Sequence, residues 1–272
     1  MLVGEIVLLY KKKDPCDVRN YRPITLLNVV YKILTKILVS RLKRVIEEIV
    51  SPTQNGFVPR RRIQWNTQLL NLIQAYLDET DEEGLFLLLD WEKAYDRVSW
   101  EYLNEAARAL NLGDTMCGWI AMLYDTDESA CQSEPDALKR PPPIQRSRVF
   151  RRVCVNGYRS EYFQLGCGTA QGCPASPLFF LLVAEALSRM IVDDKELKGI
   201  TINKVEHKLS QFADDTVLFL KLQGIKRVRG HIRTYEKGTG ALANVGKEEG
   251  LRLGRYRQAV YDNPLHGFDE LI

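Results

Sequence analysis

Apolar residues along the chain occur in two spacings, short continuous runs and helical repeats, which together predict a mixed α and β protein. The continuous runs cover residues 6–10 and 84–89 and are typical of buried strands. The helical repeats predict helices, because their apolar positions recur on one face. Helices are expected over residues 28–50, 64–80, 100–110, 115–124 and 176–192, and an irregular basic helix over residues 225–237.

We expect an α+β fold in which an antiparallel sheet is backed by helices. A hairpin is predicted over residues 153–165, because Asn156-Gly157 is a favoured tight-turn pair. Residues 199–202 and the segment 209–220 are expected to supply further strands of the same sheet.

Two adjacent carboxylates, Asp214 and Asp215, lie between the apolar runs of that last segment, which predicts a strand, an acidic turn and a second strand. Neighbouring carboxylates repel, so a pair at such a turn often binds a cation. A solvated turn is the alternative, because Asp-Asp is ordinary turn chemistry.

A third carboxylate, Asp90, ends the apolar run 84–89, as expected of a ligand at the tip of a buried strand. A strand-end Asp and a turn pair can converge on two Mg²⁺ ions and support phosphoryl transfer, although spacing alone does not establish that they converge. Ser99 is predicted to cap a helix that begins at Trp100.

The chain has 272 residues, 45% of them hydrophobic, which suits a soluble globular protein of one large or two small domains. Its net charge of +3 is too small to indicate a nucleic-acid binder. Basic residues nevertheless cluster near the candidate motifs, and we expect a nucleic-acid groove there, although one cluster alone is usually a solvated face. The clusters cover residues 11–13, 41–44, 60–62, 139–152 and 226–233.

The six cysteines show no Cys-x-x-Cys spacing, and none of the three histidines lies at zinc-ligand spacing from a cysteine pair. We interpret the cysteines as reduced thiols of an intracellular protein. The apolar runs are too short for a membrane span, and no signal peptide is recognisable. We therefore expect a soluble, intracellular protein with no membrane partner.

The ordered motifs of the chain resemble those of reverse transcriptases, most closely the non-LTR (LINE-type) retrotransposon branch. The palm-like motifs are Asp90 with Lys-Ala-Tyr-Asp at 93–96, Gln-Gly-Cys-Pro-Ala-Ser-Pro at 171–177 and Phe-Ala-Asp-Asp at 212–215. Residues 20–28 and 54–59 resemble the first two fingers motifs of that branch. The resemblance runs from about Gly4 to about Gly254 and is interrupted near residues 126–150.

The resemblance implies that Asp90, Asp214 and Asp215 are catalytic and hold two Mg²⁺ ions, for which Mn²⁺ can substitute. It also implies that Lys247 protonates the departing pyrophosphate, a role that requires a tuned pKa. The alternative for Lys247 is an ordinary exposed lysine, as a solvated turn is for Asp214 and Asp215. Asp96 is a further candidate carboxylate, which we expect to be structural and paired with Lys93 or Arg97.

Four more residues are implied to bind substrate. Arg22 matches the arginine that reaches the nucleotide triphosphate, a task suited to its bidentate fork. Tyr95 matches the aromatic residue that blocks a 2′-hydroxyl, and Gln171 with Gly172 matches residues beside the nucleotide and template. The sequence departs from the branch at Ala170, where arginine is common, and the loss of that cation would weaken nucleotide binding.

The resemblance further implies a right-hand polymerase with a fingers region at 1–83, a palm region at 84–254 and a tail at 255–272. We expect a disordered insertion near 131–150, because its proline and arginine content lacks apolar periodicity. We also expect the thumb to be missing from the chain.

The implied activity is RNA-directed DNA polymerisation on an RNA template with a DNA primer and deoxynucleotide triphosphates. No protein partner is identifiable, and a nuclear location is implied by the resemblance alone. Two alternatives stay open. One is an inactive, nucleic-acid-binding remnant of a retroelement, and the other is a mobile-intron or cellular reverse transcriptase.

Overall fold

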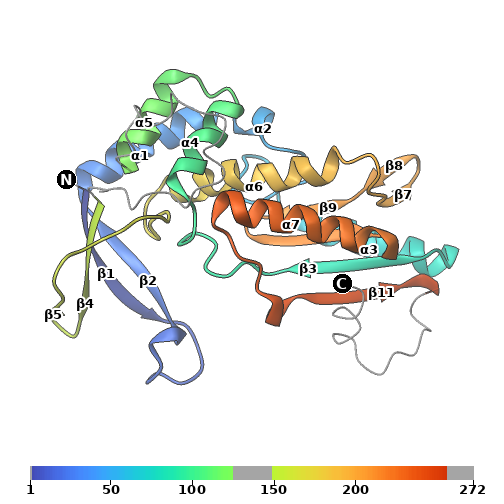
Figure 1. The fold of residues 1–272 in the computed structure, drawn as a ribbon, viewed down its shortest axis with the longest axis horizontal. Helices are drawn as coiled ribbons and strands as arrows, with labels where there is room; N and C mark the ends of the chain where they lie inside the picture. The colour runs from blue at the N-terminus through green and yellow to red at the C-terminus, as the bar shows by residue number, and fades with distance from the viewer. Residues whose placement is uncertain (1, 125–148, 256–272) are drawn as a thin grey trace. The chain divides into compact units, whose positions relative to one another are not determined.

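The computed structural model describes residues 2–124 and 149–255, which Figure 1 draws as a coloured ribbon. It divides into two units, each built from two separate stretches of chain. The first unit contains Met1–Arg44 and Tyr95–Val183, and the second contains Val45–Ala94 and Ala184–Ile272. Since neither unit is one continuous range, the linear assignment of fingers to 1–83 and palm to 84–254 stays a prediction.

The first unit contains a sheet with one parallel and one antiparallel pairing at its centre. Strand β1 (Leu2–Tyr10) pairs antiparallel with β2 (Tyr21–Leu27), in a register that places Leu9 opposite Arg22. On its other side β1 pairs parallel with β4 (Val149–Val155). A segment late in the chain therefore completes a sheet that begins at the first residues, a pairing that local periodicity does not predict.

Two short strands, β5 (Tyr158–Arg159) and β6 (Phe163–Gln164), pair antiparallel with β4. Asn156 and Gly157 have φ of 51° and 82°, the left-handed conformations expected of the predicted tight turn. The predicted hairpin is confirmed. The expected insertion near 131–150 lies outside the described residues up to position 148, and its last two positions belong to β4.

The predicted helices of the first unit are confirmed as α4 (Trp100–Ala109) and α5 (Asp114–Tyr124). Ser99 caps α4 as expected, because its side-chain oxygen accepts a hydrogen bond from the Tyr102 amide at 3.3 Å. Helix α6 (Ser176–Val192) has the predicted bounds and is divided between the units after Val183.

The single helix predicted over residues 28–50 is wrong. Helix α1 (Val29–Leu42) ends where the Arg44 amide donates to the Arg41 carbonyl, a tight turn that stops the α-helical ladder, and α2 (Ile46–Ile49) follows. The buried face of α1 consists of Thr35, Leu38 and Leu42. Three apolar positions of the repeat are exposed instead, namely Val30, Ile33 and Ile37.

The second unit contains a four-stranded sheet in the order β11-β3-β10-β9, in which every pairing is antiparallel. The strands are β3 (Gly84–Leu89), β9 (Leu209–Phe212), β10 (Asp215–Leu220) and β11 (Glu249–Leu253). The apolar run 84–89 is thus a central strand with sheet neighbours on both edges, and five of its six residues are buried. The predicted antiparallel sheet is confirmed.

Residues 199–202 do not join that sheet, so the prediction for them was wrong. Strand β7 (Ile200–Ile202) pairs with β8 (Val205–His207) in a separate two-stranded sheet. The reason is local, because Asn203 and Lys204 have φ of 50° and 68° and form a tight turn that folds β8 back onto β7.

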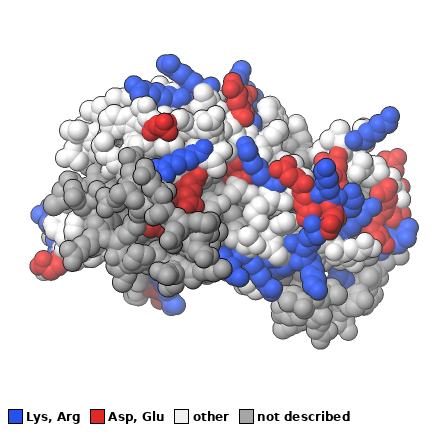
Figure 2. All heavy atoms as spheres, turned by 45° about the horizontal axis from the view of Figure 1, so that its top comes forward, with Lys and Arg blue, Asp and Glu red and all other residues white. Residues whose placement is uncertain are grey.

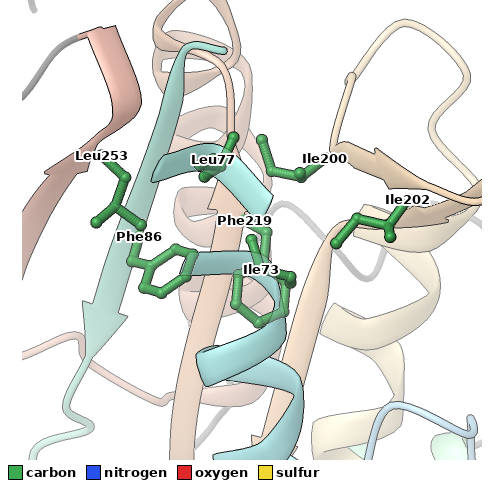
Figure 3. Close-up of a cluster of buried hydrophobic side chains, with 7 residues drawn as sticks. All are labelled: Ile73, Leu77, Phe86, Ile200, Ile202, Phe219 and Leu253. Atoms are coloured by element: carbon green, nitrogen blue, oxygen red, sulfur yellow. The ribbon is translucent and has the colours of Figure 1, made fainter. Parts of the chain in front are cut away.

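Helices α3 (Ile63–Thr80) and α7 (Ile225–Thr239) back the second unit's sheet. Figure 3 shows that α3 contributes Ile73 and Leu77 to a cluster of buried side chains that point toward one another. The rings of Phe86 and Phe219 meet at 5.1 Å in an edge-to-face arrangement. The other members are Ile200, Ile202 and Leu253.

The α+β fold class is confirmed, with antiparallel sheets and backing helices. Two short 3₁₀ helices, η4 (Leu222–Gly224) and η5 (Val245–Lys247), connect the later elements. Among the helices that the structure describes, none has the length and hydropathy needed to span a bilayer. The predicted tail at 255–272 lies outside the described residues from position 256 onward.

We predict that Ile73→Ala lowers the free energy of unfolding of the second unit by about 2–5 kcal/mol, because the fully buried side chain leaves a cavity in this cluster. Urea denaturation followed by circular dichroism measures the change. Leu72→Ala on the same helix is the control, because Leu72 is exposed and should change stability by about 0.5 kcal/mol or less. Equal losses in the two variants would contradict the packing.

Candidate functional site

Two carboxylates lie at one end of the β3–β10 strand pair in the second unit. The register pairs Leu89 with Thr216. Asp90 directly follows Leu89, and Asp215 directly precedes Thr216. The two aspartates are therefore at the positions of the next residue pair in the same antiparallel register. Facing residues of such a pair share one side of the sheet. The fold therefore brings together two predicted site residues from distant parts of the chain.

The third carboxylate, Asp214, lies in the turn that joins β9 to β10. Phe212 pairs with Asp215, which leaves Ala213 and Asp214 as the central residues of a tight turn. Asp215 is exposed and Asp214 is partly buried. The hairpin predicted around the acidic pair is confirmed, and all three carboxylates belong to the second unit.

Asp90 already has a counter-ion in this structure. Its Oδ2 accepts hydrogen bonds from Lys247 Nζ at 2.8 Å and from Asn244 Nδ2 at 3.1 Å. The Asn244 amide also donates to the Asp90 carbonyl at 2.8 Å, so the segment before β11 is fixed across the end of β3. Lys247 is thus next to Asp90, as the site prediction requires. Asn244 was missed as a contact, although it lies in the same short segment.

The chemistry of these side chains suits a divalent cation, since carboxylate oxygens are the ligands that Mg²⁺ prefers. The β3–β10 register also places two of the three backbones together. Within residues 2–124 and 149–255, however, no three Asp, Glu, His or Cys side chains are grouped closely enough to hold a metal ion. The donor set fits in type and backbone placement, and its role as a metal site stays a prediction.

The predicted substrate residues belong to the first unit, where Gly172 packs against β2. Gly172 has φ of 115°, and a Cβ there would lie 2.5 Å from the Thr25 carbonyl oxygen. The neighbouring Gln171 carbonyl accepts a hydrogen bond from the Thr25 amide at 2.6 Å. Arg22 lies on β2, as Thr25 does, and is exposed. The fold therefore places the loop that carries Gln171 and Gly172 against the strand that carries Arg22.

Tyr95 joins this group through backbone and ring contacts. Its carbonyl accepts a hydrogen bond from the Thr169 amide at 2.7 Å, and its ring lies 4.9 Å from the Phe180 ring. Asp96, which we expected to pair with a neighbouring cation, accepts a hydrogen bond from Gln171 Nε2 at 3.4 Å. The tyrosine is therefore fixed beside the loop that carries Gln171.

The loop after Gly172 has a buried support. Cys173 Sγ lies 4.0 Å from Tyr31 Oη. Burial raises the pKa of Tyr31 and the pKa of Tyr124, so both phenols stay neutral near physiological pH. Burial lowers the pKa of Arg151, an effect that the charges of Tyr31, Tyr124 and Cys173 partly oppose, but an arginine remains charged. Cys173, which directly follows Gly172, is thus buried next to Tyr31.

The basic clusters are partly neutralised by ion pairs. Figure 2 shows Lys and Arg side chains beside Asp and Glu side chains on the face that it draws. Arg60 pairs with Glu47, and Arg61 donates hydrogen bonds to backbone carbonyls, whereas Arg62 is exposed. The later cluster is similar, since Arg229 pairs with Glu248. Fewer cations are therefore available to phosphates than the sequence clusters suggest.

Comparison with known proteins gives one family and several relatives. The family model described as reverse transcriptase (RNA-dependent DNA polymerase) matches residues 10–251. The chain is 30% identical over 250 residues to the transposon TX1 uncharacterized 149 kDa protein of Xenopus laevis, covering 91% of this chain and 17% of that protein. It is 25% identical over 240 residues to the RNA-directed DNA polymerase from mobile element jockey of Drosophila melanogaster, covering 85% of this chain and 22% of that protein.

Among solved structures, the chain is similar in fold to apo telomerase from Candida tropicalis truncated from its C-terminal domain. The TM-score is 0.61 at 12% identity, covering 96% of this chain and 51% of that one. Telomerase from Candida albicans gives a TM-score of 0.56 at 11% identity, covering 96% of this chain and 42% of that one. The chain thus spans about half or less of these structures and under a quarter of the two curated relatives above.

We predict that Gly172→Ala breaks the contact between this loop and β2, because its Cβ would overlap the Thr25 carbonyl oxygen. Hydrogen exchange at the Thr25 amide, which donates to Gln171, should accelerate. Gly157→Ala is the matched control, since Gly157 also has a positive φ but a Cβ added there would meet no atom within 4 Å. Unchanged exchange at Thr25 in Gly172→Ala would contradict the close approach.

Proposed function

Since the chain belongs to the reverse transcriptase (RNA-dependent DNA polymerase) family, we propose that it extends a DNA primer on an RNA template. The observation that carries this proposal is the β3–β10 register, which takes Asp90 and Asp215 to the same end of one strand pair, with Asp214 in the adjoining turn. The substrates proposed are an RNA template, a DNA primer and deoxynucleotide triphosphates.

In the proposed reaction Asp90, Asp214 and Asp215 hold two Mg²⁺ ions, or Mn²⁺ in their place. Bound there, the ions would supply Lewis-acid activation of the primer 3′-hydroxyl and stabilisation of the leaving pyrophosphate. The carboxylates themselves orient the site, because β3 and β10 are central strands whose positions are fixed by neighbours on both edges. Rigid placement is what such a site requires.

Lys247 is proposed to have two states. In this structure its ammonium neutralises Asp90, so the carboxylate is not left with an uncompensated charge. Its side chain is 65% exposed, which leaves it room to move away from Asp90. We propose that Lys247 then donates a proton to the pyrophosphate oxygen as a general acid.

Four residues of the first unit are proposed to bind the nucleotide. Exposed Arg22 would hold triphosphate oxygens with its planar fork. The Tyr95 ring, kept in place by Phe180, would exclude a 2′-hydroxyl by steric contact. Gln171 and Gly172 would line the nucleotide and template, because a glycine lets the backbone approach a ligand closely.

A second candidate function is nucleic-acid binding without catalysis. It is favoured by the Asp90 contacts with Lys247 and Asn244, and by the absence of a grouped metal-ligand set within the described residues. Ala170, which replaces a cation common in the non-LTR branch, points the same way. Primer extension on an RNA template with Mg²⁺ separates the two functions, because a remnant would bind the duplex without extending it.

We predict that Asp214→Ala reduces primer extension by about a thousandfold or more, since metal-ion stabilisation contributes several kcal/mol to the barrier. Affinity for the primer–template duplex should change little, because it depends on phosphate contacts. Asp193→Ala, an exposed aspartate of the same unit, is the control. Extension at the wild-type rate by Asp214→Ala would show that the site assignment is wrong.

We predict that Lys247→Met lowers the extension rate by about a hundredfold, the usual contribution of a general acid. Stability should change by about 1 kcal/mol or less, because the Asp90–Lys247 pair is exposed to solvent. Single-turnover extension and urea denaturation measure the two quantities. Lys237→Met, another exposed lysine of the second unit, should leave both unchanged. A purely structural Lys247 would lose stability and rate together.

A further inference from the structure

A buried glutamine contacts the turn that carries Asp214. Gln54 is only 1% exposed. Its Oε1 accepts a hydrogen bond from the Ala213 amide at 2.8 Å, and its Nε2 donates to the Ala213 carbonyl at 3.1 Å. Oε1 accepts a further bond from the Gly56 amide at 2.8 Å. One side-chain amide therefore binds both polar backbone groups of a single turn residue.

That turn residue has a strained backbone. Ala213 has φ of 58°, in the left-handed region, and is 5% exposed. Two-residue hairpin turns with a positive φ at their first central position favour glycine there, because a Cβ crowds the following peptide. Strained conformations persist only where the surroundings over-determine them. The two bonds from Gln54 supply that constraint immediately before Asp214.

The approach of the two segments is close enough to require a glycine. A Cβ at Gly56 would lie 2.2 Å from the Ala213 nitrogen and 3.0 Å from the Phe212 carbonyl carbon. Any side chain at position 56 would therefore push the turn away. The backbones of Gly56 and Ala213 are therefore in close contact, and Gln54 Oε1 accepts a hydrogen bond from the amide of each.

Gln54 is itself held rigidly. The Gln211 amide donates to the Thr53 carbonyl, and the Asn55 amide donates to the Gln211 carbonyl, both at 2.8 Å. Arg61 Nη1 donates to the Gln54 carbonyl at 2.7 Å. The segment thus pairs with β9 directly before the turn, so the position of the glutamine is set by the sheet that carries Asp214.

Side chains of the same hairpin form hydrogen bonds next to the turn, and one of these bonds reaches Asp214. Gln211 Nε2 donates to Thr216 Oγ1 at 3.3 Å, and the Thr216 hydroxyl donates to the Asp214 carbonyl at 3.4 Å. These bonds are long. The short bonds that fix the conformation of Ala213 come from Gln54.

From these contacts we propose that Gln54 is a positioning residue that sets the direction of Asp214 and Asp215. The proposal rests on the proposed polymerase function, in which these carboxylates hold the metal ions. Without the two hydrogen bonds from Gln54, Ala213 relaxes toward a negative φ and turns Asp214 away from the end of β3. Only an amide suits this position, because the Ala213 amide needs an acceptor and its carbonyl needs a donor.

The test is Gln54→Met, which keeps the length of the side chain but removes its donor and its acceptor. Gln68→Met, an exposed glutamine on α3, controls for the substitution itself. Ile73→Ala controls for stability, because it weakens the core of the same unit without touching the turn. The full chain is used throughout, at a temperature where thermal unfolding shows every variant to be folded.

In Gln54→Met we expect faster amide hydrogen exchange at residues 213–215 in metal-free protein, because the Ala213 amide loses its acceptor. Mn²⁺ affinity, measured by electron paramagnetic resonance of the free ion, should fall about 10- to 100-fold, as for other residues that orient metal ligands. The turnover number should fall with it, while affinity for primer–template duplex stays unchanged. Adding Ala213→Gly should restore part of the Mn²⁺ affinity, because glycine adopts the left-handed conformation without strain.

The proposal is overturned if Gln54→Met matches the wild type in hydrogen exchange and Mn²⁺ affinity, or if Ile73→Ala shows the same losses at equal stability. Failure of the proposed function is a separate result, namely a wild-type chain that extends no primer with Mg²⁺ or Mn²⁺. In that event exchange at residues 213–215 and Mn²⁺ affinity still decide the role of Gln54.

Discussion

The antiparallel pairing of β3 with β10 is the interaction on which the site depends. The register that sets Leu89 opposite Thr216 carries Asp90 and Asp215 to one end of the pair, and the turn before β10 adds Asp214. A shift of one residue would send one of the carboxylates to the opposite side of the sheet, because side chains alternate along a strand. The buried cluster around Ile73 and Phe219 prevents that shift by fixing which residues of β10 face α3.

Placing carboxylates together is unfavourable, and the fold compensates for it locally. Asp90 is neutralised by Lys247 and hydrogen-bonded by Asn244, so its charge has a partner even without a cation. The acidic turn is constrained at Ala213 by the hydrogen bonds with Gln54 and by the close approach of Gly56. Rigid backbone with a replaceable counter-charge is the arrangement that the proposed exchange of Lys247 for metal ions requires.

The family and much of the fold were predictable from the sequence. The resemblance to reverse transcriptases is confirmed by the family match over residues 10–251, and the acidic hairpin, the Ser99 cap and the bounds of α6 are confirmed by the structure. Local chemistry explains these successes, because caps, tight turns and apolar repeats act over a few residues. The helix predicted over 28–50 was wrong for the same reason, since apolar spacing continues through the turn at Arg44 that ends α1.

By itself the sequence determined most of the kinds of element and the family, and it nominated the residues proposed to carry the chemistry, because each depends on short-range patterns or on motif order. Only the tertiary structure decided that β4 pairs parallel with β1, that β7 joins β8 instead of the larger sheet, and that Lys247 and Asn244 contact Asp90. It alone placed Gln54 against Ala213. Such contacts join residues far apart in the chain, and which of them form depends on how the whole set of strands and helices packs.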